Sequence, residues 1–187
     1  MGKMRMFLRQ SSVGREPLAI AMSGVRMGER VLQIGMDTPA VTSLLAAKPG
    51  LSGESSIVVA DEATAAQARR AVAETNALVN IGVHPLDALP LVSGSVDLIV
   101  VHNRDGQSLP ASRSTRVLEE CRRVLRSGGR VVVLEKGTPT GLAAIFRSRT
   151  EPATETTVRV LEAAGFRAVR MLGDRDGYRF VEGLNVG

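Results

Sequence analysis

The chain has 187 residues, 44% of them hydrophobic, and a net charge of +5, which fits one globular domain with a sizeable core. A single cysteine, Cys121, excludes an internal disulfide, and with only two histidines beside it we expect no structural zinc site. No apolar run approaches the ~18–20 residues of a membrane span, and no apolar stretch follows the basic segment Met1–Gln10. We therefore expect no membrane association, no secretory signal and a cytoplasmic location.

The charge is unevenly spread along the chain. Residues 1–30 hold six basic and two acidic side chains, residues 31–99 three and seven, and residues 100–130 seven and three. Such a distribution can steer an anionic substrate or nucleic acid, but no aromatic residues interleave with the basic ones, so we favour solvated helix faces. The basic N-terminal arm, residues 1–14, is expected to fray, with a lid or docking segment as the alternative.

The predicted elements alternate between helix and strand. In chain order we expect a helix at 15–24, a strand at 31–34, a helix from Pro39 to Pro49, a strand at 57–60, a helix at 62–74, strands at 78–83 and 96–102, a helix over 117–125 ended by Ser127-Gly128-Gly129, a strand at 131–134, a helix around 158–165, and strands at 166–172 and 178–181. This order predicts an α/β fold in a single domain, residues 1–187. Its core is a Rossmann-like, seven-stranded, mostly parallel sheet with helices on both faces and a C-terminal antiparallel hairpin. Residues 136–152 form the longest irregular stretch and are expected to be a mobile loop near the site.

A tight turn follows the first of these strands. Arg30–Pro39 runs from a strand through Gly35 into a helix, and Val58–Glu62 ends a second strand on an acidic pair. This is the layout of a nucleotide-type cofactor site in a parallel sheet. Gly35 serves either close approach of a ligand or the turn alone. Asp61 suits two vicinal ribose hydroxyls, and capping of the helix at Glu62 is compatible with that role.

Five segments of the chain follow one another in an order that is typical of one protein family. They are Arg30–Gly35 at the first turn, Asp61 after the second strand, Ala88–Pro90 with Ser93–Val100 leading into the fourth strand, Leu118–Arg130 between helix and fifth strand, and Leu161–Phe166 between the last helix and the sixth strand. Together they resemble the class I S-adenosylmethionine-dependent methyltransferases of the small-molecule type, over about residues 15–183. The resemblance implies methyl transfer from S-adenosylmethionine to an unidentified, small-molecule acceptor.

The departures from the family pattern concern the cofactor. The family usually has an acid at the position of Gln33 and glycines at those of Asp37 and Pro39. Glycines there let the backbone approach the methionine portion of the cofactor, whereas proline also removes a backbone donor. Where the family often has an acid contacting adenine, this chain has Pro85, and Asp87 is the acid placed to substitute for it.

The resemblance implies a set of cofactor contacts: Gly35, Asp37, Asp61, Asp87 and His102. Asp37 either binds the cofactor ammonium in place of the missing acid or caps the following helix, and we favour the cap. His102, with Asn103 at the carboxyl end of the fourth strand, is the one candidate general base, and a hydrogen-bonded histidine at the rim is the alternative. The substrate is expected to enter above the fourth and fifth strands, near residues 136–149.

Two other readings stay open. One is a non-catalytic binding or scaffolding protein of the same fold, with Met36, Asp37 and Pro39 partly filling its cleft. The other is a nucleic-acid modifier that uses the arginine face of residues 113–126. The family's Asn-Pro-Pro-Tyr signature is absent, which disfavours methylation of amino groups on bases or glutamine. Cys121 is expected to be inert in the core, and a homodimer is among the assemblies we expect.

Overall fold

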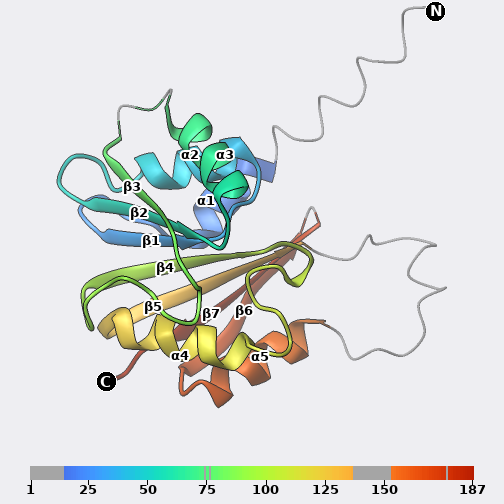
Figure 1. The fold of residues 1–187 in the computed structure, drawn as a ribbon. Coiled ribbons are helices and arrows are strands. Elements are labelled where there is room, and N and C mark those ends of the chain that lie inside the picture. Colours follow the sequence, from blue (N-terminus) through green and yellow to red (C-terminus); the bar gives the residue numbers. More distant parts are fainter. Residues whose placement is uncertain (1–14, 74, 76, 137–152, 176) are drawn as a thin grey trace, which may run out of the picture.

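The computed structural model describes residues 15–73, 75, 77–136, 153–175 and 177–187. All seven strands join one sheet in the order β3-β2-β1-β4-β5-β7-β6, shown in Figure 1. The strands are β1 (Arg30–Ile34), β2 (Glu54–Val59), β3 (Val79–Val83), β4 (Val96–Asn103), β5 (Leu125–Lys136), β6 (Arg167–Arg175) and β7 (Tyr178–Leu184). Only β7 runs antiparallel to its neighbours, so the predicted mostly parallel sheet with a C-terminal hairpin is confirmed. The arm at 1–14 and most of the predicted loop at 136–152 lie outside the described residues.

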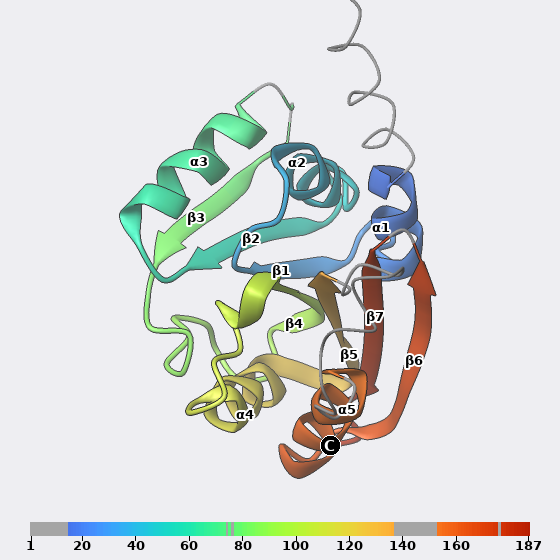
Figure 2. The same ribbon diagram turned by 90° about the vertical axis from the view of Figure 1, so that its right-hand side faces the viewer.

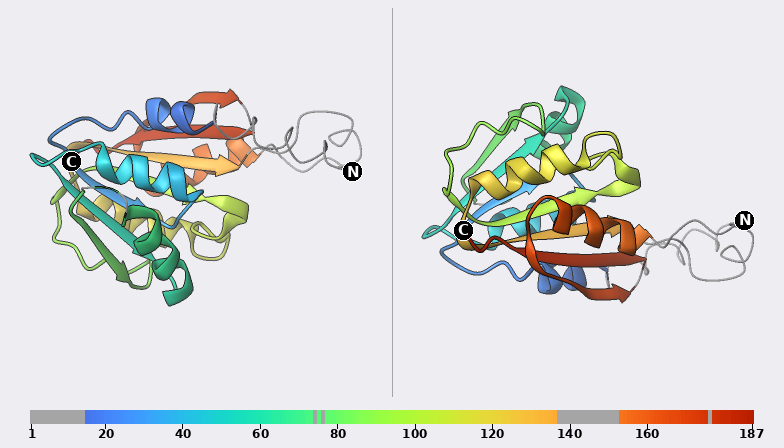
Figure 3. Two further views of the ribbon diagram at one scale, coloured as in Figure 1. Left: turned by 90° about the horizontal axis from the view of Figure 1, so that it is seen from above. Right: turned by 90° about the horizontal axis from the view of Figure 1, so that it is seen from below.

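Helices cover both faces of the sheet, as predicted (Figures 1 and 2). They are α1 (Arg15–Ser23), α2 (Pro39–Ala47), α3 (Glu62–Val72), α4 (Ser114–Val124) and α5 (Ala153–Ala163), with a short 3-10 turn, η1 (Arg104–Gly106), after β4. The first three lie on one face, seen from above in the left view of Figure 3, and α4 and α5 lie on the other, seen from below in the right view. No helix among the described residues is long and apolar enough to cross a membrane.

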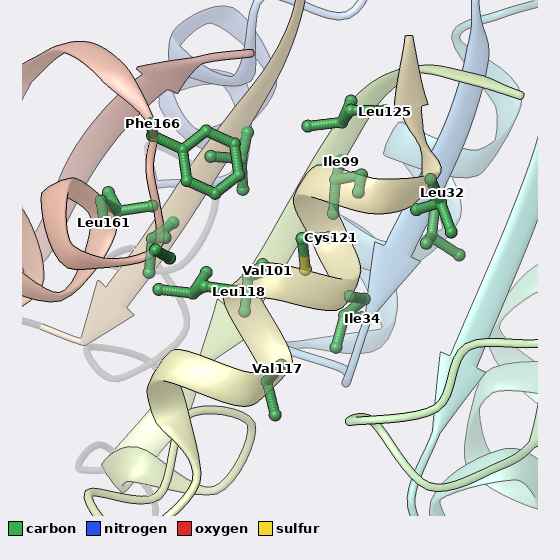
Figure 4. Close-up of a cluster of buried hydrophobic side chains, with 14 of the residues drawn as sticks. Leu32, Ile34, Ile99, Val101, Val117, Leu118, Cys121, Leu125, Leu161 and Phe166 are labelled. Atoms are coloured by element: carbon green, nitrogen blue, oxygen red, sulfur yellow. The ribbon is translucent and has the colours of Figure 1, made fainter. Parts of the chain in front are cut away.

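The core is aliphatic and divided by the sheet. Alternate residues of the central strands pack toward α4 and α5, and the intervening ones pack toward α1 and α2. Figure 4 shows the first of these layers, with Leu32, Ile34, Ile99 and Val101 of the sheet near Val117, Leu118 and Cys121 of α4. Each such side chain contributes about 1.5–3 kcal/mol by leaving water. Cys121 is fully buried, so its predicted place in the core is confirmed, and burial raises the pKa of its thiol.

The end of α4 differs from the prediction. The helix ends at Val124, and β5 begins at Leu125 rather than after the glycine pair. The amide of Asn185 donates hydrogen bonds to the carbonyl oxygens of Arg122 and Leu125, at 3.2 and 2.9 Å. A distant side chain therefore satisfies the helix end, and no local glycine cap is needed.

An ion-pair clamp holds the amino edge of the sheet. Asp97 of β4 accepts hydrogen bonds from the backbone N–H of Arg30 (2.8 Å), from its Nε (3.1 Å) and from Nε of Arg126 (2.5 Å). Although partial burial of the Asp97 carboxyl opposes ionisation, these bonds hold its pKa well below the ordinary value. The clamp fixes β1 against β4 at the end of the sheet away from the candidate site.

Candidate functional site

The turn after β1 is held by the protein's own packing. Gly35 has a φ of +74°, and its N–H donates to the carbonyl oxygen of Val58 at 2.9 Å. A Cβ at this position would lie 2.2 Å from Oγ of Ser108 and 3.1 Å from the carbonyl oxygen of His102. The hydroxyl of Ser108 in turn donates to that same carbonyl at 2.8 Å. Glycine is therefore required by the turn and by Ser108, whether or not a ligand approaches.

The residue that caps α2 is Thr38. Its side chain accepts the N–H of Val41 at 3.3 Å, and Pro39 takes the first helical position, as the sequence predicts. The favoured role of Asp37 as the cap is wrong, because Thr38 already provides the oxygen that the helix end needs. Oδ2 of Asp37 is buried and has no hydrogen-bond partner among the described residues.

His102 is held from the opposite side of the same turn. Gln33 is fully buried, its amide nitrogen donates to the carbonyl oxygen of Thr42 at 3.1 Å, and its Oε1 lies 2.9 Å from Nε2 of His102. Because Gln33 presents an oxygen, His102 must carry its proton on Nε2, which leaves Nδ1 as an acceptor. That Nδ1 is buried and has no partner.

The charge state of His102 follows from its surroundings. The side chain is only 2% exposed, so it does not lie at the rim. Burial lowers the pKa of His102 to about 4, while the negative charge of Asp37 acts in the opposite direction. His102 is neutral at pH 7. Asp37 and His102 thus each present one buried acceptor atom without a hydrogen bond. Leaving such an atom unpaired costs the folded protein about 1–3 kcal/mol.

Asp61 ends the loop after β2 and caps α3, as predicted. Its Oδ1 accepts the N–H of Thr64 and its Oδ2 accepts the Thr64 hydroxyl, both at 2.8 Å. The bonds from the backbone and hydroxyl of Thr64 lower the pKa of Asp61. The carboxylate is exposed, so acceptor positions that these bonds do not use face solvent. Capping leaves it able to bind hydroxyl groups, and its role toward ribose stays a prediction.

A cavity of about 370 Å³ opens at the carboxyl ends of β2 and β3. Its lining consists of Ala60, Val83, His84, Pro85, Leu86, Asp87, Gln107, Ser108, Pro110, Arg113 and Val117. The carboxyl of Asp87 lies there, 3.9 Å from Nη1 of Arg113. The volume falls in the range of small-ligand pockets. Ser108 lines this cavity and also packs against Gly35, in the turn that leads to Asp37.

The sequence analysis missed Glu135, the penultimate residue of β5. It is 7% exposed and pairs in register with Asn103 of β4. Its Oε1 accepts hydrogen bonds from the Thr157 hydroxyl at 2.5 Å and from the Asn103 amide at 3.5 Å. Its Oε2 is buried without a partner. The available signal was a charged residue directly after the apolar run of residues 131–134, where a buried strand should continue.

Comparisons with known proteins agree with this fold. Residues 31–129 match a family model described as a methyltransferase domain. No curated protein matches the sequence. A solved S-adenosylmethionine-dependent methyltransferase from Aquifex aeolicus is 20% identical, with a TM-score of 0.73 over 91% of this chain and 89% of that one.

Two further solved structures are similar. One is an S-adenosylmethionine-dependent methyltransferase from Thermotoga maritima, described as a possible histamine N-methyltransferase, at 18% identity and a TM-score of 0.64 over 96% of this chain and 94% of that one. The other is the cyclase SpnF, at 19% identity and a TM-score of 0.67 over 93% of this chain and 81% of that one. At these identities the likeness establishes the fold, which also carries chemistry other than methyl transfer.

Proposed function

Because this chain belongs to the methyltransferase domain family, we propose that it transfers a methyl group from S-adenosylmethionine to a small-molecule acceptor. The observation that carries the proposal is the pair of buried, unpaired acceptors, Oδ2 of Asp37 and Nδ1 of His102. They lie at the carboxyl ends of β1 and β4, where ligands bind in open α/β sheets.

The residues present fit this cofactor. It carries an ammonium group, a ribose with two vicinal hydroxyls, and an adenine. Asp37 and His102 would accept hydrogen bonds from the ammonium, the free positions of Asp61 would accept those of the ribose, and the cavity beside Asp87 would take the adenine. The bound cofactor would supply a methyl group already activated by a positively charged sulfur, so the protein has mainly to position the reactants.

The altered first motif is consistent with this role. Gln33 stands where the family usually has an acid, and its amide fixes the ring of His102 instead of contributing a charge. Asp37 would supply the negative charge near the same turn. Gly35 keeps the turn tight in either case. The negative charge that the family usually has at position 33 would thus be supplied four residues later, by Asp37.

A second candidate function is a non-catalytic binding protein of the same fold. The observation that favours it is the close packing of Ser108 on Gly35, which narrows the approach to the turn. Met36, expected to fill the cleft under this reading, instead packs with Ala46, Ala65 and their neighbours beneath α2 and α3. Met36 is not part of the lining of the cavity.

The nucleic-acid reading loses much of its support. Arg123 of α4 is bonded to Glu120 at 2.8 Å, and Arg126 is bonded to Asp97 at 2.5 Å. These two guanidinium groups serve the protein's own contacts, so the arginine face offers fewer free groups for phosphate binding than the sequence indicates.

Calorimetry with S-adenosylmethionine tests the proposal. We expect one binding site, and we expect Asp37→Asn to weaken binding about 10–100-fold, the loss of one charged hydrogen bond. Asp105→Asn is the matched control, since Asp105 is an exposed acid with a φ of +52° that asparagine tolerates. No heat at roughly millimolar cofactor, far above the affinity that a working site needs, would refute the proposal. Binding that neither variant alters would remove Asp37 from it.

A further inference from the structure

Two buried glutamates lie on neighbouring strands and differ in one respect. Glu182 of β7 is 8% exposed, and Arg170 holds its carboxylate through Nε at 3.0 Å and Nη2 at 2.9 Å. Glu135 of β5 is 7% exposed, and among the described residues it has no cationic partner. Within the part of the chain that the structure describes, an arginine therefore neutralises the charge of Glu182, and no cation does so for Glu135.

Glu135 is held in a single orientation. The Thr157 hydroxyl on α5 and the Asn103 amide on β4 both donate to Oε1, at 2.5 and 3.5 Å. Oε2 receives no hydrogen bond. A buried acceptor without a hydrogen bond costs free energy, and the cost is larger for a carboxylate oxygen than for a neutral one. A ligand that donates a hydrogen bond to Oε2 would remove this cost, so the arrangement favours binding of such a ligand.

The position of Glu135 is separate from the proposed cofactor contacts. Side chains alternate along β4 and β5, so Asn103 and Glu135 lie toward α5, whereas His102 lies toward α2 with Gln33. Both sets belong to the carboxyl edge of the sheet. A ligand at Glu135 would therefore be a second molecule beside the cofactor, not a part of it.

We propose that Oε2 of Glu135 binds the methyl acceptor through an O–H or N–H donor, so that the acceptor is an alcohol, a phenol or an aliphatic amine. This inference rests on the proposed function. A carboxylate acceptor is excluded because it would place two like charges together in a buried site. Asn103 and Thr157 position the glutamate, and Glu135 selects the acceptor.

The test uses three probes that share one skeleton: 2-phenylethanol, phenethylamine and phenylacetate. The side-chain carboxyl carbons of glutamate are labelled with ¹³C, and the Glu135 resonance is followed as each probe is added to the wild-type protein. We expect a saturable shift with the alcohol or the amine, at an affinity about tenfold or more above that for the acid. Which of the two binds tells a neutral donor from a charged one.

Two variants assign the effect to one oxygen. Glu135→Gln keeps Oε1 for Thr157 and Asn103 but replaces Oε2 by an amide that donates. Because this variant has no Glu135 resonance, probe binding to it is measured by calorimetry. Binding of the amine, which can only donate, should be lost, and binding of the alcohol should be weakened. Glu182→Gln is the matched control and should bind the probes as the wild type does. The comparison of the three probes on the wild type decides the matter even where a variant fails to fold.

The possible outcomes are distinct. No saturable shift with the alcohol or the amine, an equal response to phenylacetate, or unchanged binding to Glu135→Gln would overturn the inference. Probe binding without any calorimetric signal for S-adenosylmethionine would leave Glu135 as a donor-binding site and remove the proposed function. Binding of S-adenosylmethionine without binding of the alcohol or the amine would leave the proposed function standing and would overturn the inference about Glu135.

Discussion

Replacing Gly35 by alanine is expected to destabilise the protein, because the added methyl group has no room. In the structure its carbon would lie 2.2 Å from Oγ of Ser108 and 3.1 Å from the carbonyl oxygen of His102. The φ of +74° adds a cost of its own, about 1–2 kcal/mol for any residue with a side chain. Turning the Ser108 hydroxyl away would lose its hydrogen bond to His102, a further ~1 kcal/mol.

These two terms alone give about 2–3 kcal/mol, a large share of the roughly 5–15 kcal/mol that stabilises most domains. For a chain of this length that corresponds to a fall in melting temperature of roughly 10 °C. Urea unfolding followed by circular dichroism measures the loss directly.

A double-mutant cycle separates the two causes. In a Ser108→Gly background the methyl group meets less, so the cost of Gly35→Ala should fall toward the ~1–2 kcal/mol of the backbone alone. If the alanine variant were as stable as the wild type, or if Ser108→Gly gave no relief, the packing of Ser108 on this turn would be refuted.

Three further expectations concern charge and reactivity. Asp97→Asn should lower the free energy of unfolding by roughly 2 kcal/mol at pH 7, a figure discounted for solvent screening because Arg30 and Arg126 are nearly half exposed. Since the pKa of Asp97 is lowered in the folded protein, this contribution should fade as pH falls below about 4. A urea midpoint that the substitution leaves unchanged at pH 7 would contradict the clamp. By ¹⁵N spectroscopy, His102 should stay neutral and carry its proton on Nε2 from pH 8 to 5, whereas titration near pH 6.5 would show an exposed ring. Because the pKa of His102 is lowered to about 4 in the folded protein, the free energy of unfolding should decline as pH falls below ~6.5, by roughly 3 kcal/mol at most. Cys121 should react with a thiol reagent only on unfolding, and rapid modification of the native protein would contradict its burial.

The sheet could be predicted because its central strands are parallel and buried on both faces. Such strands read as continuous apolar runs, as at residues 96–102 and 131–134, and both are found within β4 and β5. The cap at Asp61 could be predicted because capping is local, with donor and acceptor three residues apart, whereas the cap of α2 was expected at Asp37 and lies one residue later, at Thr38. In these places the sequence around a residue determines its structure.

The candidate site was less predictable because its contacts are long-range. Ser108 lies in a loop with no hydrophobic pattern, and nothing near it in the sequence indicates that it packs against Gly35. The end of α4 depends on Asn185, from the far end of the described chain. Glu135 shows its open oxygen only when Asn103 and Thr157 are in place around it.

A crystal structure of the protein grown with saturating S-adenosylmethionine tests the central claim most directly. We expect the cofactor's ammonium within hydrogen-bond reach of Asp37 Oδ2 and His102 Nδ1, and its adenine in the cavity beside Asp87. A structure in which both acceptors remain without a ligand and the cavity stays empty, with Ser108 unmoved on Gly35, would contradict it.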